Sequence, residues 1–265
     1  MSKPAGLHRR RIVQEEFACI SESYSRLAAR RGAEREARAI AEWLRPRPGE
    51  RVLDAACGPA RLARALAPHV AEVHGLDLCP RMIEMARQLS RPNGARLFLT
   101  VGDVESLPYP RRGFDLVVST YVFANLPDPL RVLEEFSRVL GRGGRVAIID
   151  VVAPESQARR ARLNHLEALR GRLPTRLLSA SEFQRLFQQA GLRVESKRFQ
   201  RRRSRFRDWL RLSPAAVRPG RAQTLRRMIL ESMEGGDAEF EVRRVAGELF
   251  LYHNTGWFLL RRGSR

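Results

Sequence analysis

Cysteine is scarce in this chain, and its few cysteines form no pattern. There are three, Cys19, Cys57 and Cys79, with no Cys-x-x-Cys pair and no histidine at ligand spacing. An odd count without such spacing supports neither a disulfide framework nor a zinc site. We therefore expect no metal centre, and a reducing compartment such as the cytoplasm fits.

Long apolar runs are absent as well. No stretch of about eighteen consecutive apolar residues occurs, so the sequence predicts no transmembrane helix. The first residues, Met1 to Arg11, are charged, but the apolar segment of a secretory signal does not follow them. We therefore expect a cytoplasmic protein without a membrane span.

Lysine is almost missing, although the chain is strongly basic. Of the 49 basic residues only Lys3 and Lys197 are lysine, and the formal net charge is +20. Such a charge indicates an anionic partner, but selection for phosphate contacts gives no reason to exclude lysine. The arginines are scattered, with their densest cluster at Arg201-Arg202-Arg203, Arg205 and Arg207. A solvated surface is therefore favoured over a nucleic-acid footprint, which stays open.

Short apolar segments alternate with helical patterns between residues 51 and 152. The predicted strands are 51–54, 70–76, 97–101, 114–119 and 145–152, and the predicted helices are 61–67, 80–89 and 129–140. Strands that alternate with helices of about ten residues predict a parallel sheet with right-handed crossovers.

The pattern is less regular towards the C-terminus. Residues 156–170 predict an arginine-rich helix, and the capping box Ser179-Ala180-Ser181-Glu182 starts another. Residues 192–199 predict a sixth strand, 204–246 a mainly helical insertion, and 248–262 two strand segments around a turn at residues 253–256.

An acid ends each of the first three strands. Asp54 precedes a small-residue loop that leads into a helix, where free backbone N–H groups suit a carboxylate or phosphate. Asp77 follows about twenty residues beyond the loop, a position from which a carboxylate accepts from both hydroxyls of a ribose. Asp103 is placed to accept from an adenine amine. Because parallel strands end at one edge of a sheet, we expect the three carboxylates to line one crevice.

Two classes of cofactor compete for such a crevice. A dinucleotide site has Gly-x-Gly-x-x-Gly directly after the first strand, and the segment Asp54-Ala55-Ala56-Cys57-Gly58-Pro59-Ala60 lacks it. The Asp54 carboxylate repels pyrophosphate but attracts an ammonium and a sulfonium. The electrostatics therefore favour S-adenosylmethionine as the cofactor.

The motifs, taken in order, resemble those of class I S-adenosylmethionine-dependent methyltransferases, and most closely the type 11 or ubiquinone/menaquinone methyltransferase-like subgroup. Roughly residues 17–200 carry the resemblance. The matching segments are 52–60, 75–82, 101–104, 114–120 and 138–149, and 107–109 and 123–129 are also typical of the subgroup.

The resemblance implies an architecture. With the elements above, it predicts an α/β, Rossmann-like, mostly parallel seven-stranded sheet with an antiparallel last strand, helices on both faces and a small helical cap. Residues 1–45 would form an N-terminal helical lid, 46–203 and 247–262 the methyltransferase core, and 204–246 the helical cap.

The resemblance also implies which residues hold the cofactor. The loop after the first strand would lie beneath the methionine part, the second strand end would hold ribose and flank adenine, and the third would read the adenine edge. Tyr24 would close on the methionine carboxylate or serve ordinary packing. The implied residues are Tyr24, Asp54, Ala56, Gly58, Pro59, Asp77, Leu78, Met82, Asp103, Val104 and Thr120.

One residue departs from the family pattern, since Ala60 stands where a second glycine is usual. Its methyl group crowds the loop, or is harmless if the local φ is negative. Weakened cofactor binding, and a protein that holds the cofactor without turnover, therefore stay open.

The acceptor side is less defined. Methyl transfer needs no metal, and it needs a general base only when the nucleophile carries a proton of high pKa. Candidates near the methyl group are Tyr121, Asn125 and His165, with His253 as a further one. Each also has an ordinary structural interpretation, so the sequence assigns no base.

The favoured function is methylation of a small molecule, either quinone-like or another secondary metabolite. An RNA or protein methyltransferase that uses the basic surface is the alternative, and a non-catalytic cofactor-binding protein is a third. Ser119-Thr120-Tyr121-Val122 replaces the Asn/Asp-Pro-Pro-aromatic tetrad of many amino methylases, which counts against methylation of base amines. The sequence fixes neither the acceptor nor the oligomeric state.

Overall fold

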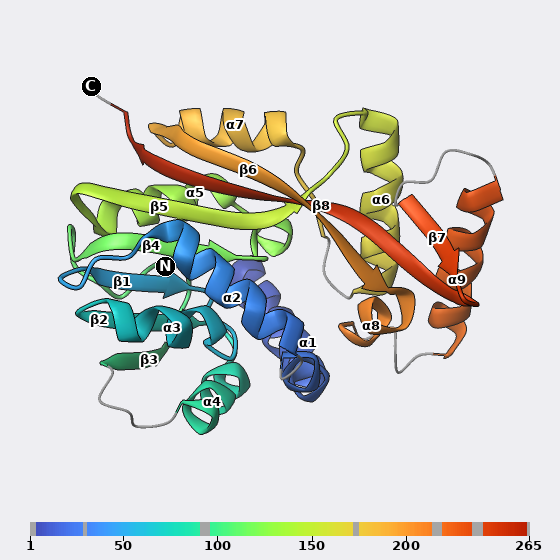
Figure 1. Ribbon diagram of the computed structural model, residues 1–265, viewed down its shortest axis with the longest axis horizontal. Coiled ribbons are helices and arrows are strands. Elements are labelled where there is room, and N and C mark those ends of the chain that lie inside the picture. The colour runs from blue at the N-terminus through green and yellow to red at the C-terminus, as the bar shows by residue number, and fades with distance from the viewer. Residues whose placement is uncertain are drawn as a thin grey trace.

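The computed structural model describes residues 4–28, 31–90, 96–171, 175–213, 219–234 and 241–263. One long twisted sheet runs through the molecule, with helices on both of its sides (Figure 1). At the carboxyl ends of the parallel strands, the last strands continue beyond the others into a second group of helices (Figure 1).

The described residues form an eight-stranded sheet in the order β3-β2-β1-β4-β5-β8-β6, with β7 paired to β8. β1 to β5 pair in parallel, whereas β8 is antiparallel to β5, β6 and β7. The bounds are β1 Arg51–Ala55, β2 Glu72–Asp77, β3 Leu97–Val101, β4 Phe114–Thr120, β5 Leu140–Val152, β6 Leu192–Arg205, β7 Glu241–Val245 and β8 Glu248–Arg262. The predicted α/β class, with a mostly parallel sheet and an antiparallel last strand, is confirmed.

Helices cover both faces because alternate residues of the central strands point to opposite sides. Val52 and Leu116 lie in one core with α2, α3 and α4, and Leu53 and Val117 lie in another with α5 and α7. The bounds are α1 Pro4–Ala28, α2 Arg31–Leu44, α3 Arg61–Leu66, α4 Pro80–Leu89, α5 Pro129–Val139, α6 Gln157–Arg170, α7 Ala180–Gln189, α8 Phe206–Arg211 and α9 Pro219–Glu234, with short 3-10 helices at Ala67–His69 and Phe123–Asn125.

A third core fills the end of the molecule beyond β5. The pairing of β5 with β8 stops at Val152, but β6, β7 and β8 continue as an antiparallel ribbon. Helices α6, α8 and α9 pack on this ribbon through a cluster that includes Leu166, Trp209, Ile229 and Leu251. We call this end the cap.

The cap differs from the prediction in two places. Residues 204–246 were expected to be mainly helical, and α8 and α9 lie there, but β6 runs to Arg205 and Glu241–Val245 form β7, so the described sheet has eight strands rather than seven. Residues 253–256 were expected to form a turn, yet they lie inside the continuous strand β8. Partner strands on both sides hold this polar segment extended, since Thr255 is paired with Val151 of β5 and with Gln200 of β6.

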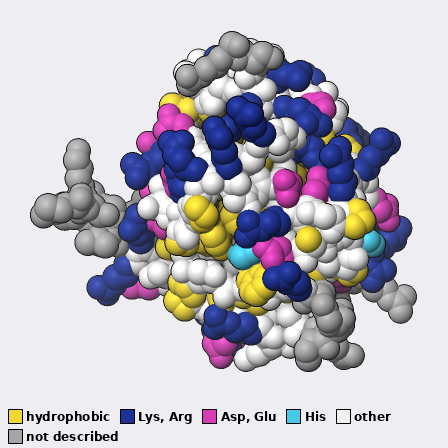
Figure 2. Space-filling view, turned by 90° about the vertical axis from the view of Figure 1, so that its left-hand side faces the viewer, with side chains coloured by type: hydrophobic (Ala, Val, Ile, Leu, Met, Phe, Trp, Pro, Cys, Tyr) yellow, Lys and Arg dark blue, Asp and Glu magenta, His cyan; other side chains and the backbone are white. Residues whose placement is uncertain are grey.

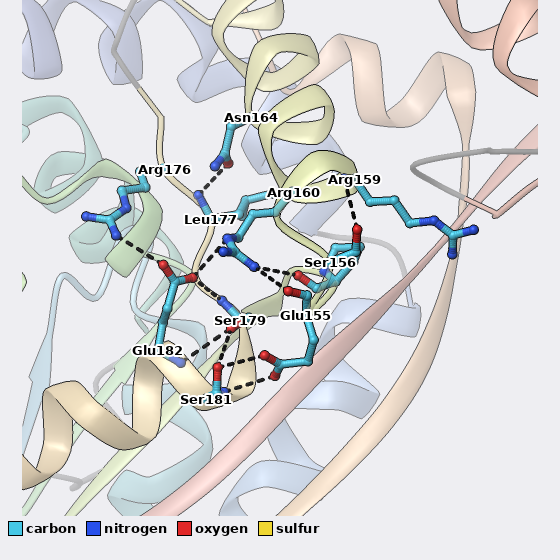
Figure 3. Close-up of polar contacts among 11 residues, drawn as sticks. Glu155, Ser156, Arg159, Arg160, Asn164, Arg176, Leu177, Ser179, Ser181 and Glu182 are labelled. Carbon is cyan, nitrogen blue, oxygen red and sulfur yellow. Dashed lines mark hydrogen bonds and ion pairs between the residues drawn. The ribbon is translucent and has the colours of Figure 1, made fainter.

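A polar network joins the start of α6 to the start of α7 (Figure 3). Arg160 contacts Glu182 at 3.1 Å and donates to the carbonyl of Glu155 at 2.9 Å. The Ser181 hydroxyl donates to Glu155 at 2.7 Å, and the predicted capping box between Ser179 and Glu182 is present. This hydrogen bond from Ser181 lowers the pKa of Glu155. The network therefore fixes one cap helix to the core at the carboxyl end of β5.

Arginines are spread over the face where the parallel strands begin, with acidic and apolar side chains between them (Figure 2). Several form ion pairs, such as Arg261 with Glu195 at 2.8 Å and Arg138 with Glu135 at 2.7 Å. This mixture fits the predicted solvated surface. Within the described residues, no helix combines the length and apolar character needed to cross a bilayer.

Candidate functional site

Three carboxylates lie at the carboxyl ends of neighbouring parallel strands. Asp54 lies in β1, Asp77 is the last residue of β2, and Asp103 is the second residue after the end of β3. The Gly58 amide donates to Asp77 Oδ2 at 2.8 Å, which ties the loop after β1 to the end of β2. The Gly102 amide donates to the Asp77 carbonyl at 2.9 Å. The fold thus brings the predicted acids to one edge of the sheet.

The loop after β1 winds tightly into α3. Ala56, Gly58 and Ala60 all have positive φ, at 62°, 53° and 55°. Ala60 is fully buried, and its φ of 55° is not the negative value under which its methyl group was expected to be harmless. A left-handed alanine costs about 1–2 kcal/mol relative to its favoured conformation. Tyr121, after β4, has φ 57°, and such strained residues are typical of ligand-binding edges.

Asp54 is buried, and only one of its oxygens has a partner among the described residues. The residue is only 1% exposed, and its Oδ2 accepts a hydrogen bond from the Ala63 amide of α3 at 3.0 Å. Oδ1 is buried and accepts no hydrogen bond from the described part of the chain. Burial raises the pKa of Asp54 to about 7. An orphaned buried carboxylate oxygen is a group that a cationic ligand would satisfy.

Asp77 is held on both oxygens by backbone amides. Besides Gly58, the Cys79 amide donates to Oδ1 at 2.9 Å. Burial nevertheless raises the pKa of Asp77. Each oxygen of an ionised carboxylate has two acceptor positions, so these bonds fix the orientation of Asp77 without exhausting its capacity to accept.

Helix α1 lies over the outer two acids. Arg10 contacts Asp103 at 2.6 Å, and the side-chain amide of Gln14 donates to the Leu78 carbonyl at 3.0 Å. Phe17 packs on the buried cluster that contains Met82. Leu78 and Met82 therefore lie beneath the predicted N-terminal lid. The side chain of Tyr24 lies outside the described residues.

A cavity of about 750 Å³ lies beyond the ends of β4 and β5, between these strands, α1, α2 and the cap. Its apolar and aromatic lining includes Phe17, Trp209 and Phe250. Tyr121, Asn125 and His253 also line it. His165 is exposed and is not among the lining residues, so the structure does not bring this candidate to the site.

Tyr121 is part of a polar chain along one wall of this cavity. Its hydroxyl donates to Glu36 of α2 at 2.5 Å, and Glu36 contacts Arg202 of β6 at 2.8 Å. Burial, together with Glu36, raises the pKa of Tyr121 well above its usual value. Tyr121 is therefore a neutral donor at physiological pH.

Asp150, at the carboxyl end of β5, is a site residue that the sequence reasoning missed. It is buried and lines the cavity, and its Oδ2 accepts from the amides of Val122 and Phe123 at 3.0 and 2.9 Å. Burial raises its pKa to about 6. It fixes the segment that carries Tyr121 and Asn125. The available signal was a carboxylate near the carboxyl end of an apolar strand, although Val151 and Val152 continue the strand beyond it.

The remaining predicted cofactor residues surround the same edge. Pro59 is buried in the loop after β1, and Val104 is buried directly after Asp103. Thr120 ends β4. Among the described residues, no group of three or more His, Cys, Asp or Glu side chains is arranged to hold a metal ion.

Comparison with known proteins agrees with this geometry. A family of methyltransferase domains matches residues 53–148, a segment that runs from within β1 to within β5 and includes Asp54, Asp77 and Asp103. This segment therefore resembles a methyltransferase domain. The predicted resemblance to the class I, type 11 methyltransferases is thereby confirmed.

Two curated proteins to which this chain is similar are named for small molecules. The demethylmenaquinone methyltransferase of Deinococcus radiodurans is 37% identical over 153 residues, which cover 54% of this chain and 62% of the relative. Aklanonic acid methyltransferase DauC of Streptomyces is 38% identical over 119 residues, or 43% of this chain and 54% of the relative. The matches thus span little more than half the length of these relatives.

The similarity of fold extends further. The crystal structure of the BH2331 protein from Bacillus halodurans aligns with a TM-score of 0.77 at 25% identity, covering 86% of this chain and 99% of the other. Most of the chain therefore shares one known fold with this structure.

Proposed function

We propose that the chain is an S-adenosylmethionine-dependent methyltransferase that acts on a small organic molecule. The observation that carries this proposal is Asp54, whose Oδ1 is buried without a partner among the described residues. A ligand ammonium group would satisfy that oxygen, and a sulfonium nearby would gain from the same negative charge. The residues present therefore fit the cofactor.

The other predicted residues complete the cofactor site. Asp77, held by two amides, would accept from ribose hydroxyls, with Leu78 and Met82 beside the adenine. Asp103 and Val104 would face the adenine edge, and Thr120 the methyl-bearing end. Ala56, Gly58 and Pro59 would let the methionine part lie against the backbone, because small side chains permit a close approach.

The cofactor supplies an activated methyl group, so the chain chiefly has to position an acceptor and exclude water. The cavity beside β4 and β5 provides the space. Tyr121 and Asn125 line it from the segment that Asp150 fixes, and they are the residues we assign to acceptor contact. The names of the two relatives support a small-molecule acceptor rather than RNA or protein.

A product assay tests this proposal. The purified chain would be incubated with S-adenosylmethionine and either a panel of phenols, hydroquinones and aromatic acids or total RNA, and S-adenosylhomocysteine would be quantified. We expect acceptor-dependent release with at least one small molecule and none with RNA. Release only with RNA would favour the alternative, and cofactor binding without any release would favour a non-catalytic role.

A further inference from the structure

Two arginines flank His253 inside the cavity. Arg202 and His253 are paired across β6 and β8, so their side chains lie on the same face of the sheet. Arg170 reaches the cavity from the end of α6, and all three residues line it. Burial first, then Arg202 and Arg170, lowers the pKa of His253 to about 4. The imidazole is therefore neutral at physiological pH, between two permanent positive charges.

A carboxylate holds each guanidinium in place, one from α2 and the other from α6. Arg202 contacts Glu36 of α2 at 2.8 Å, and 33% of the arginine side chain is exposed. Arg170 contacts Glu167 at 2.7 Å, and 22% of its side chain is exposed. One carboxylate does not use all five donors of a guanidinium. Both groups are thus oriented but still accessible from the cavity.

The wall next to Arg170 is aromatic and rigid. The Arg170 guanidinium lies 4.7 Å from the centre of the Trp209 ring, and it donates to the Trp209 carbonyl at 3.2 Å. The Trp209 indole donates to Glu167 at 3.2 Å. A flat ring system would find an apolar surface here, directly beside the positive charges.

We infer that the acceptor is an aromatic carboxylate, whose acid group lies between Arg170 and Arg202 beside the neutral His253. This inference rests on the proposed function and specifies its substrate class. A planar carboxylate matches the fork of donors that a guanidinium presents. A neutral aromatic molecule would fill the same space without engaging either guanidinium.

Calorimetry with matched probes tests the inference. The full chain would first be saturated with S-adenosylhomocysteine and then titrated with 1-hydroxy-2-naphthoate or with its neutral counterpart 1-hydroxy-2-naphthamide. We expect the acid to bind at least about tenfold more tightly than the amide, because a charge-assisted hydrogen bond is worth more than a neutral one. Equal affinities of acid and amide in the wild-type chain would overturn the inference.

Three variants test whether the preference for the acid over the amide comes from the arginines of the cavity. Arg202→Gln should remove most of the preference for the acid, and Arg185→Gln, an exposed arginine of α7, should leave it unchanged. The double change Glu36→Gln and Arg202→Gln avoids a stranded carboxylate, and it should lose the preference while keeping the uptake of S-adenosylhomocysteine. A preference that persists in the double variant also overturns the inference.

The titration with S-adenosylhomocysteine distinguishes failure of the proposed function from failure of the proposed substrate class. Absence of heat with S-adenosylhomocysteine would contradict the proposed function itself. Normal heat with S-adenosylhomocysteine, followed by indifference between acid and amide, would leave the proposed function intact and reject only the aromatic carboxylate.

Discussion

Arg10 of α1 forms an ion pair with Asp103 at a distance of 2.6 Å. The side chains are 34% and 16% exposed, so water reaches the pair and limits its strength to about 1 kcal/mol or less. The carboxylate that we assign to the adenine edge is thus engaged by the N-terminal helix. On this assignment, cofactor binding and this ion pair compete for one group.

Replacing Arg10 should therefore strengthen cofactor binding. In Arg10→Gln, Asp103 is available without first breaking the ion pair, and the dissociation constant for S-adenosylhomocysteine should fall about two- to fivefold. Arg11→Gln is the matched control, because Arg11 pairs with Glu15 of its own helix. Calorimetry measures both, and weaker binding by Arg10→Gln would show instead that Arg10 contacts the bound ligand.

Ala60→Gly should stabilise the protein. Glycine adopts the observed φ of 55° without the penalty that a side chain pays, so the free energy of unfolding should rise by about 1 kcal/mol. Ala63→Gly, inside the helix α3 that Ala60 precedes, should lower the free energy of unfolding by a similar amount. Urea denaturation compares the two, and destabilisation by Ala60→Gly would mean that the methyl group contributes more through packing than it costs through strain.

Binding of S-adenosylhomocysteine should depend on the ionisation of Asp54. Burial raises the pKa of Asp54 to about 7, so the carboxyl is mainly neutral at pH 6, while the ligand ammonium favours the ionised form. The association constant should thus rise by up to about tenfold per pH unit below 7 and level off above it. Asp54→Asn should bind weakly and without this pH dependence. A flat profile for the wild-type chain would place the ammonium elsewhere.

Asp150 should act as a positioning residue. In Asp150→Ala the buried amides of Val122 and Phe123 lose their acceptor, and the unfolding free energy should fall by about 2–4 kcal/mol. Asp150→Asn keeps one acceptor oxygen and should lose less. In the Asn variant kcat should fall more than tenfold, while the affinity for S-adenosylhomocysteine changes less than about twofold. Equal losses in both quantities would argue for a purely structural role.

The sequence predicted the core better than the cap for a physical reason. Strands β1, β2, β4 and β5 bury most of both faces, and they read as apolar runs between helical repeats. In β7, by contrast, Val242 is buried and the arginines beside it are exposed, so only its pairing with β8 makes it a strand. Residues 253–256 have the composition of a turn, yet β6 pairs with all of them and β5 pairs with 254–256 from the other side, which holds them extended.

The site residues likewise include some that the sequence predicts and some that it does not. Asp54, Asp77 and Asp103 were predictable because parallel topology alone brings the ends of β1, β2 and β3 to one edge. Asp150 follows the same rule. The pairing of Arg10 with Asp103, and the positions of Arg170 and Arg202 around His253, depend on how α1 and the cap fold back over the sheet. No local pattern in the sequence encodes those contacts.

Calorimetric titration of the purified chain with S-adenosylhomocysteine tests the central claim most directly. The account predicts saturable binding of one molecule per chain, weakened at least about tenfold by Asp77→Ala, because the carboxylate that we assign to the ribose, and its contacts with Gly58 and Cys79, are then lost. No measurable heat with the wild-type chain, or identical affinity in Asp77→Ala, would contradict it.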